Sequence, residues 1–218
     1  MDHKTVINLN QIDNEVNTDK KKIKIIAVSK TFSIPTIMPL LNFGHIHYGE
    51  NKVQEAVQKW TELKKKFNNI KLHLVGKLQT NKVKFILPLF DYIHSLDNLK
   101  LAEKISNEQK KRNFTPKIFI QVNIGNEVSK NGIELKDLEM FFETCKNKLN
   151  LNIIGLMCIP PMASEPKKYF KKMNELNHKL NLRELSMGMS NDYKSAIDNG
   201  ATFIRVGTKI FGNRINQS

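Results

Sequence analysis

The sequence predicts an α/β fold, a single (β/α)8 barrel preceded by an amino-terminal helix. Eight short apolar runs alternate with longer amphipathic stretches from residue 23 onward, and this alternation indicates a parallel sheet. Several runs are continuous, as expected of strands buried on both faces. A chain of 218 residues without a Pro- or Ser-rich linker suits one barrel. We therefore expect a TIM barrel at 23–218 and a helical extension at 1–22.

The expected elements follow one another in a regular order. In the extension, apolar residues recur at helical spacing from Val6 to Val16, so we expect an amphipathic helix that covers the bottom of the barrel. Helical patterns also fill the intervals between the strands, and one begins at Leu99 with Asp97 as its expected N-cap. The expected strands lie at 24–30, 45–49, 71–76, 92–96, 118–123, 152–159, 184–189 and 203–206.

The charge balance is strongly basic. The net charge is +14, from 35 Lys and Arg residues against 21 Asp and Glu residues, which is compatible with nucleic-acid binding. The basic residues are scattered, however, and no helix-turn-helix, zinc-finger or interleaved basic and aromatic pattern is present. The richness in Lys, Asn and Ile is also what an AT-rich genome produces. We therefore expect no specific nucleic-acid partner.

Membrane, secreted and metal-dependent classes are disfavoured by the sequence. No apolar run approaches the ~18 residues that a membrane span needs, and no apolar signal region opens the sequence. Cys145 and Cys158 are far apart and lack CxxC spacing, so we expect neither a disulfide framework nor a metal site. These features predict a cytoplasmic protein without membrane association, which we expect to be a monomer.

Lys30 ends the first apolar run. An amine that a buried strand delivers to a partly desolvated place is neutral more readily, and a neutral amine can condense with a carbonyl group. Taken alone, Lys30 fits the simpler interpretation of a strand that ends where it meets solvent, with the charged group reaching water. A second feature is needed to give it a function.

That second feature is a predicted phosphate site. In such barrels the loops after strands seven and eight commonly hold a phosphate. Ser190 follows the seventh expected strand and precedes a helix, whereas Gly207 and Thr208 follow the eighth. Hydroxyl and backbone N–H groups there suit a phosphate dianion, although a plain N-cap and a plain turn are the alternatives. A carbonyl-seeking lysine beside a phosphate site suggests pyridoxal phosphate (PLP).

Arg205 is the remaining informative residue. It lies two residues after Phe203 and two before Gly207, so the three share one face of the last strand. This periodicity indicates an arginine inside the barrel, near the end that holds the phosphate. The alternative is an outward-facing arginine paired with a carboxylate of a helix.

Short motifs follow in a specific order between residues 23 and 214. They are Ala-Val-Ser-Lys at 27–30, Tyr-Gly-Glu-Asn-Lys-Val-Gln-Glu at 48–55, His-Leu-Val-Gly-Lys-Leu-Gln-Thr-Asn-Lys at 73–82, His-Ser-Leu-Asp at 94–97, Gln-Val-Asn-Ile-Gly-Asn-Glu-Val-Ser-Lys-Asn-Gly at 121–132, Gly-Leu-Met-Cys-Ile-Pro-Pro at 155–161 and the stretch 185–212. This set resembles the pyridoxal phosphate homeostasis protein family.

The resemblance implies a barrel similar to the amino-terminal domain of alanine racemase. It implies that Lys30 holds PLP as a reversible Schiff base and that Arg205 faces the pyridine nitrogen. The phosphate would be held by Ser190, Gly207 and Thr208.

The resemblance also implies further pocket residues. Asn51 would lie beside the cofactor, and His73 and Met187 would lie in or near the pocket. Two departures from the family pattern concern the edges of the site. Lys52 stands where the family usually has tyrosine, and the segment before the first strand is shorter than usual.

Three functions compete. A PLP-dependent racemase needs an acid or base on each face of the substrate carbon. Lys30 could serve one face, but alanine racemase takes the other group from a second domain, and this chain ends soon after the eighth strand. An arginine at the pyridine nitrogen would also keep that nitrogen unprotonated and weaken the electron sink. We therefore expect no robust catalytic turnover.

The second function is intracellular PLP (vitamin B6) homeostasis, in which the protein buffers PLP or delivers it, with PLP-dependent apo-enzymes as candidate partners. The third is a basic protein that binds nucleic acid or the ribosome, for which binding would weaken steeply with salt. The resemblance favours the second.

Overall fold

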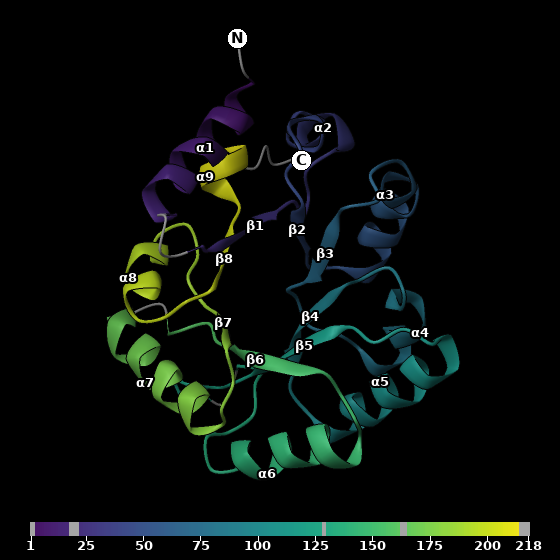
Figure 1. The fold of residues 1–218 in the computed structure, drawn as a ribbon, viewed down its shortest axis with the longest axis vertical. Coiled ribbons are helices and arrows are strands. Elements are labelled where there is room, and N and C mark those ends of the chain that lie inside the picture. Colours follow the sequence, from purple (N-terminus) through teal and green to yellow (C-terminus); the bar gives the residue numbers. More distant parts are fainter. Residues whose placement is uncertain (1–2, 18–21, 128–129, 162–164, 214–218) are drawn as a thin grey trace.

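Eight parallel strands close into a barrel in the computed structural model of the chain (Figure 1). The structure describes residues 3–17, 22–127, 130–161 and 165–213; parts of the predicted extension and of the motif at 121–132 lie outside these ranges. Strand β1 pairs with β8, which closes the barrel and confirms the predicted fold class. The strands are β1 (Lys24–Val28), β2 (His47–Glu50), β3 (Lys71–Leu74), β4 (Tyr92–Leu96), β5 (Lys117–Gln121), β6 (Ile153–Met157), β7 (Glu184–Ser186) and β8 (Phe203–Val206).

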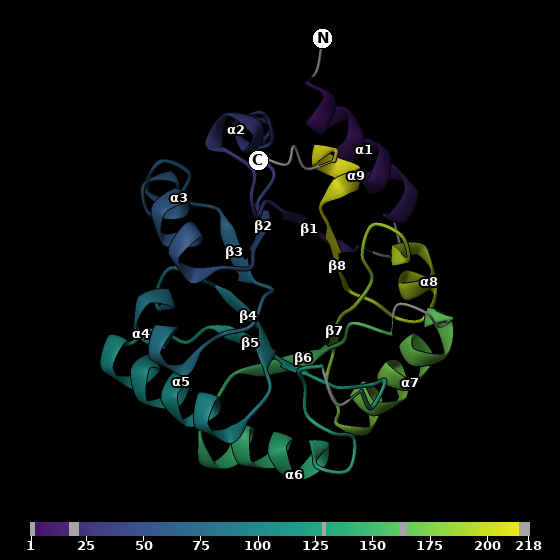
Figure 2. The same ribbon diagram turned by 180° about the vertical axis from the view of Figure 1, so that it is seen from behind.

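Helices surround the barrel, as Figures 1 and 2 show from its two ends. The α-helices of the described ranges are α1 (Lys4–Val16), α2 (Ile34–Phe43), α3 (Val53–Lys66), α4 (Val83–Ile86), α5 (Leu99–Arg112), α6 (Leu138–Glu143), α7 (Pro166–Lys179), α8 (Tyr193–Asp198) and α9 (Thr208–Phe211). Each expected strand is present, although several end two or three residues earlier than predicted.

Helix α1 has the predicted apolar face, since the residues of that face from Val6 to Val16 are buried. Its position differs from the prediction. It lies in the outer ring beside α9 and α2 (Figure 1), and not across the bottom of the barrel. The side-chain amide of Asn8 donates to the carbonyl of Ile210 at 3.0 Å, and the Tyr193 hydroxyl donates to Glu15 at 2.6 Å. Helix α9 has only four residues, and α1 packs against it.

The N-cap of helix α5 is one residue later in the sequence than predicted. Asn98, not Asp97, is the N-cap, and its side-chain oxygen accepts from the backbone N–H of Leu101 at 2.9 Å. Asp97 supports the cap from outside, because its carboxylate accepts from the Asn98 amide at 2.7 Å. Both residue types make good caps, so sequence alone does not choose between neighbours.

The barrel interior combines apolar and polar side chains. A small cluster that includes Ile26, Phe119 and Phe203 lies apart from the larger core between strands and helices. Arg205 is only 6% exposed and lies two residues from Phe203 on β8. Its guanidinium contacts Ser186 of β7, so the predicted inward orientation of the arginine is confirmed.

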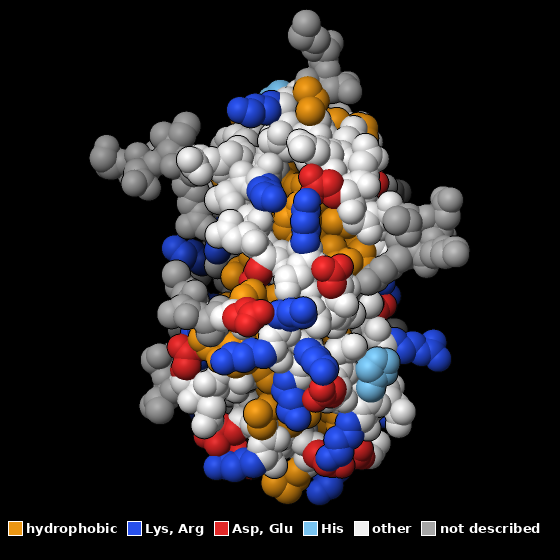
Figure 3. All heavy atoms as spheres, turned by 90° about the vertical axis from the view of Figure 1, so that its left-hand side faces the viewer, with side chains coloured by type: hydrophobic (Ala, Val, Ile, Leu, Met, Phe, Trp, Pro, Cys, Tyr) orange, Lys and Arg blue, Asp and Glu red, His pale blue; other side chains and the backbone are white. Residues whose placement is uncertain are grey.

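The surface bears mixed charge where Figure 3 displays it. On the side formed by α1, α8 and α7, basic side chains are interspersed with acidic ones and form no continuous basic stripe. Within the described ranges, none of the helices has the length and apolar character required to cross a membrane.

Candidate functional site

A cavity of about 700 Å³ lies where the strands end. Six of the eight predicted site residues border it. Lys30 follows β1 by two residues, Asn51 follows β2, and the others come from the last two strands and the loops after them. The six are Lys30, Asn51, Ser190, Arg205, Gly207 and Thr208.

The other two predicted residues are not among those that border the cavity. His73 and Met187 are both 0% exposed. His73 lies inside the barrel among other rings, and Met187 belongs to the core between strands and helices. Contact of these two residues with a cofactor stays a prediction.

The backbone on both sides of Lys30 is held by α3. The ammonium of Lys59 donates to the carbonyl of Ser29 at 3.0 Å. The backbone N–H of Thr31 donates to the carboxylate of Glu55 at 2.6 Å. Thr31 has a φ of 67°, a conformation that costs a non-glycine residue roughly 1–2 kcal/mol. These contacts fix the point at which Lys30 leaves the barrel.

A buried carboxylate organises this anchor. One oxygen of Glu50, which is 0% exposed, accepts from the Ser29 hydroxyl at 2.8 Å and from the Trp60 indole at 2.9 Å. The same oxygen lies 3.0 Å from the ammonium of Lys59, whose side chain is 8% exposed. A buried charge pair with further hydrogen bonds defines one geometry, because each partner is costly to leave uncompensated.

Arg205 is fixed at the floor of the cavity. Its Nη1 donates to the Ser186 hydroxyl at 2.7 Å and its Nη2 donates to the carbonyl of Cys158 at 2.9 Å. Burial lowers the pKa of the Arg205 guanidinium, but an arginine remains protonated in proteins. A guanidinium has five N–H donors, so these two bonds leave donors for a molecule in the cavity.

The two hydroxyls predicted to hold phosphate meet across the last two loops. Thr208 donates to Ser190 at an oxygen–oxygen distance of 3.0 Å. Ser190 is not the cap of α8, because the helix begins at Tyr193 with Asp192 as its N-cap. Thr208 is the first residue of α9, where backbone N–H groups have no acceptor within the helix. Hydroxyls and N–H groups are the donors that a phosphate accepts from.

A glycine shapes the loop that carries Ser190. Gly188 has a φ of 90°, and a Cβ atom there would lie 2.7 Å from the Cβ of Ala196. Asp192 then closes the turn, because its carboxylate accepts from the backbone N–H of Met189 at 2.6 Å. Asp192 also borders the cavity, but this bond directs one of its oxygens to the loop.

The donor set fits PLP. Hydroxyls and helix-start N–H groups suit the phosphate, the Arg205 guanidinium suits a ring nitrogen, and the amine of Lys30 suits an aldehyde. All of these groups border one cavity.

Residues that sequence reasoning missed include Lys130 and the anchor behind Lys30. Lys130 borders the cavity, and its ammonium lies 2.8 Å from the Glu127 carboxylate and 3.2 Å from the Pro160 carbonyl. Lys130 belongs to the motif at 121–132, and this motif could have indicated that it lies near the site. For Lys59 no signal existed, because a lysine in an amphipathic helix is usually exposed.

Comparison with known proteins agrees with the fold and with PLP as the cofactor. The family model for the N-terminal domain of alanine racemase matches residues 7–214. The pyridoxal phosphate homeostasis protein of Aquifex aeolicus is 40% identical over 200 residues, which cover 88% of this chain and 87% of that protein. The protein of the same name from Haemophilus influenzae is 37% identical, with coverage of 92% and 89%.

Solved structures give the same picture. PipY from Synechococcus elongatus, solved without PLP and with PLP bound, has a TM-score of 0.86 in both forms at 33% and 32% identity. The matches cover 96% and 95% of this chain and 100% of PipY. Alanine racemase from Clostridium difficile has a TM-score of 0.76 at 16% identity, and the match covers 58% of that chain. That last likeness concerns the fold alone.

Proposed function

The chain belongs to the alanine racemase N-terminal domain family and, within it, to the pyridoxal phosphate homeostasis proteins, and from this premise we propose that it binds PLP and serves PLP homeostasis. The observation that carries the proposal is the meeting of Lys30, Arg205 and the Ser190–Thr208 hydroxyl pair around one cavity. PipY, which is 32% identical in its PLP-bound form, supports it.

Each residue has a separate task in this proposal. When bound, PLP supplies an aldehyde that a lysine can hold as a reversible Schiff base, and Lys30 is the lysine for that bond. Ser190 and Thr208 donate to the phosphate, with backbone N–H groups at Gly207 and Thr208. Asn51 lies at the cavity wall on the side of Lys30.

Arg205 limits the chemistry of the site. A guanidinium donates hydrogen bonds but accepts no proton at neutral pH, so opposite a ring nitrogen it favours the unprotonated form. This form withdraws electrons weakly. The names of the relatives designate homeostasis proteins and no catalytic activity. We therefore propose reversible storage of PLP without robust racemase turnover.

The cellular setting is part of the proposal. We place the protein in the cytoplasm as a monomer that buffers PLP or hands it to PLP-dependent apo-enzymes. Both cysteines, Cys145 and Cys158, are free and buried, in keeping with a reducing compartment.

A transfer experiment tests this function. The PLP-loaded chain is mixed with a PLP-dependent apo-enzyme, and the return of enzyme activity is followed in the presence of a phosphatase that destroys free PLP. If the loaded chain still restores enzyme activity after the phosphatase has destroyed the free PLP, the result supports delivery or buffering. Recovery no better than with free PLP, or sustained alanine racemisation by the chain itself, would refute the homeostasis proposal.

A further inference from the structure

A column of hydrogen-bonded side chains runs through the barrel interior below Arg205. Ser186 Oγ lies 2.9 Å from His94 Nδ1, and His94 Nε2 lies 2.9 Å from His73 Nδ1. His73 Nε2 in turn lies 2.9 Å from His47 Nδ1. The five residues come from β8, β7, β4, β3 and β2. They connect the cavity at the carboxyl ends of the strands with the opposite mouth of the barrel.

Packing fixes the orientation of the inner rings. The His73 ring stacks on Tyr92 at a centroid distance of 4.1 Å and an interplanar angle of 11°. The His94 ring stacks on Phe119 at 4.4 Å and 21°. Burial lowers the pKa of both inner histidines well below the ordinary value, and Arg205 adds to this effect at His94. The inner rings are therefore neutral at neutral pH, and each has one donor and one acceptor nitrogen.

The arginine gives the column a direction. Arg205 can only donate, so the Ser186 oxygen accepts from it. The Ser186 hydrogen is then directed to His94 Nδ1, because Ser186 Oγ has no third partner within the described ranges. A neutral His94 that accepts at Nδ1 carries its proton on Nε2 and donates to His73. The same step repeats from His73 to His47.

We propose that Ser186, His94, His73 and His47 form a one-directional column of positioning residues for Arg205. The column keeps the Ser186 hydrogen turned away from the guanidinium and its oxygen turned toward it. Arg205 is thereby held against the floor of the cavity, with its remaining donors facing the bound molecule. The value of this arrangement for PLP rests on the proposed function, whereas the direction of the column is a property of the protein without cofactor.

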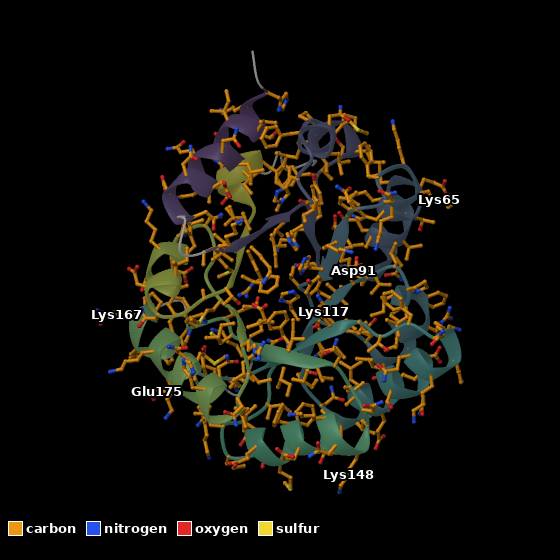
Figure 4. The ribbon with its side chains drawn as sticks, in the orientation of Figure 1. Lys65, Asp91, Lys117, Lys148, Lys167 and Glu175 are labelled. Carbon is orange, nitrogen blue, oxygen red and sulfur yellow. The ribbon has the colours of Figure 1, made fainter. Side chains whose placement is uncertain are left out.

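The far end of the column reaches the amino-terminal mouth of the barrel. His47 is half-buried and borders a second cavity there. The charged side chains near it are Lys24 on β1, Lys71 on β3 and Asp91. Figure 4 labels Asp91 and Lys117 near the centre of the view, away from the labelled side chains on the outer helices. In this direction the column ends at the Nε2–H of His47, for which no acceptor is present among the residues that the structure describes.

Nitrogen NMR of the histidine rings tests the direction in cofactor-free wild-type protein. Spectra that correlate ring protons with ¹⁵N distinguish a protonated Nδ1 from a protonated Nε2. The expected result at neutral pH is a protonated Nε2 and an unprotonated Nδ1 for both His73 and His94. A protonated Nδ1 in either ring would mean that this ring donates in the opposite direction, and that result would overturn the proposal. No variant needs to fold for this test.

Substitution of Ser186 tests the positioning role. Ser186→Ala removes the hydroxyl between Arg205 and His94, and we expect mixed tautomers at His94 and PLP affinity weaker by roughly tenfold. Ser95→Ala is the matched control, because Ser95 is a buried serine of β4 whose hydroxyl has no partner within the described ranges. Ser186→Thr keeps the hydroxyl and should restore the wild-type tautomer at His94.

The outcomes separate this inference from the proposed function. Wild-type tautomers and affinity in Ser186→Ala, or equal effects in Ser95→Ala, would refute the positioning role. If Ser186→Ala does not fold, Arg205→Met removes the donor from the other side and should also mix the tautomers. A chain that binds no PLP but has the expected tautomers would refute the function and leave the directional column intact.

Discussion

The ammonium of Lys59 lies 3.0 Å from the carboxylate of Glu50 and equally 3.0 Å from the backbone carbonyl of Ser29, the residue before Lys30. We expect Lys59→Met to lower the free energy of unfolding by about 3–5 kcal/mol, because it leaves the Glu50 carboxylate buried and uncompensated. Urea unfolding followed by circular dichroism measures the loss.

A matched control is available on the same helix. Lys65 of α3 projects from the outer surface in Figure 4, and its partner Glu62 is also exposed. Lys65→Met should change stability by no more than about 0.5 kcal/mol. Similar losses in the two variants would show that the buried pair has no special role in the anchor of Lys30.

Removal of the Arg205 guanidinium should alter how the cofactor is held. Arg205→Ala leaves the Ser186 hydroxyl and the Cys158 carbonyl without their donor and removes the donor that we propose for the ring nitrogen. We expect PLP affinity to fall by about tenfold, equivalent to about 1.4 kcal/mol, with a shifted absorption band and no gain of robust racemase turnover. Absorption titration and a racemase assay measure both effects. The exposed Arg183 provides the control, since Arg183→Ala should leave affinity and spectrum unchanged.

Acid should destabilise the fold through its buried histidines. Burial lowers the pKa of His45 and His47 to about 4, and lowers those of His73 and His94 still more clearly. The unfolded chain, with histidine pKa values near 6.5, therefore binds protons that the folded chain does not. Stability is fully present above about pH 6.5 and falls as the pH drops toward 4, by up to ~1.4 kcal/mol per pH unit for each histidine.

Urea unfolding at several pH values between 4 and 7 measures this slope. His45→Gln should reduce the proton uptake on unfolding by up to about one proton, whereas the exposed His178 of α7 offers a control, His178→Gln. A stability that is constant across this pH range would contradict the neutral, buried state of these rings.

Gly188→Ala should damage the loop that presents Ser190. The new Cβ atom would approach Ala196 to 2.7 Å and the Tyr193 backbone to 2.9 Å at a φ of 90°. Gly44 has nearly the same φ, 94°, but open space around the site of a Cβ. Gly44→Ala should therefore cost only the roughly 1–2 kcal/mol of the backbone conformation, and Gly188→Ala should cost more and weaken PLP binding. Equal losses in thermal unfolding would show that crowding at Gly188 is unimportant.

The strand order and most of the cavity could be predicted from the sequence because they follow from local patterns. Apolar runs mark the strands, and parallel closure brings the residues that follow them to one end. This reasoning suffices for Lys30, Ser190 and Thr208, which lie just beyond β1, β7 and at the start of α9.

The histidine column could not be predicted in the same way. Its members are spread over four strands, and their contacts depend on the register of strands far apart in the sequence. His94 and Ser186, for example, are separated by 92 positions. The family resemblance predicts His73 in or near the pocket; in the structure it is buried inside the barrel, and its contact with a cofactor stays a prediction. The position of α1 likewise depends on its contacts with α9 and α2, which local patterns do not reveal.

The central claim is that Lys30 is the lysine that holds PLP. Borohydride reduction of the PLP-treated protein, followed by peptide mass spectrometry, tests it most directly, because reduction makes the bond to the lysine permanent. We predict a phosphopyridoxyl group on the peptide that contains Lys30, absent from Lys30→Ala and unchanged in Lys130→Ala, which removes the other lysine identified at the cavity. A label on Lys130 instead, or no label on wild-type protein, would contradict the account.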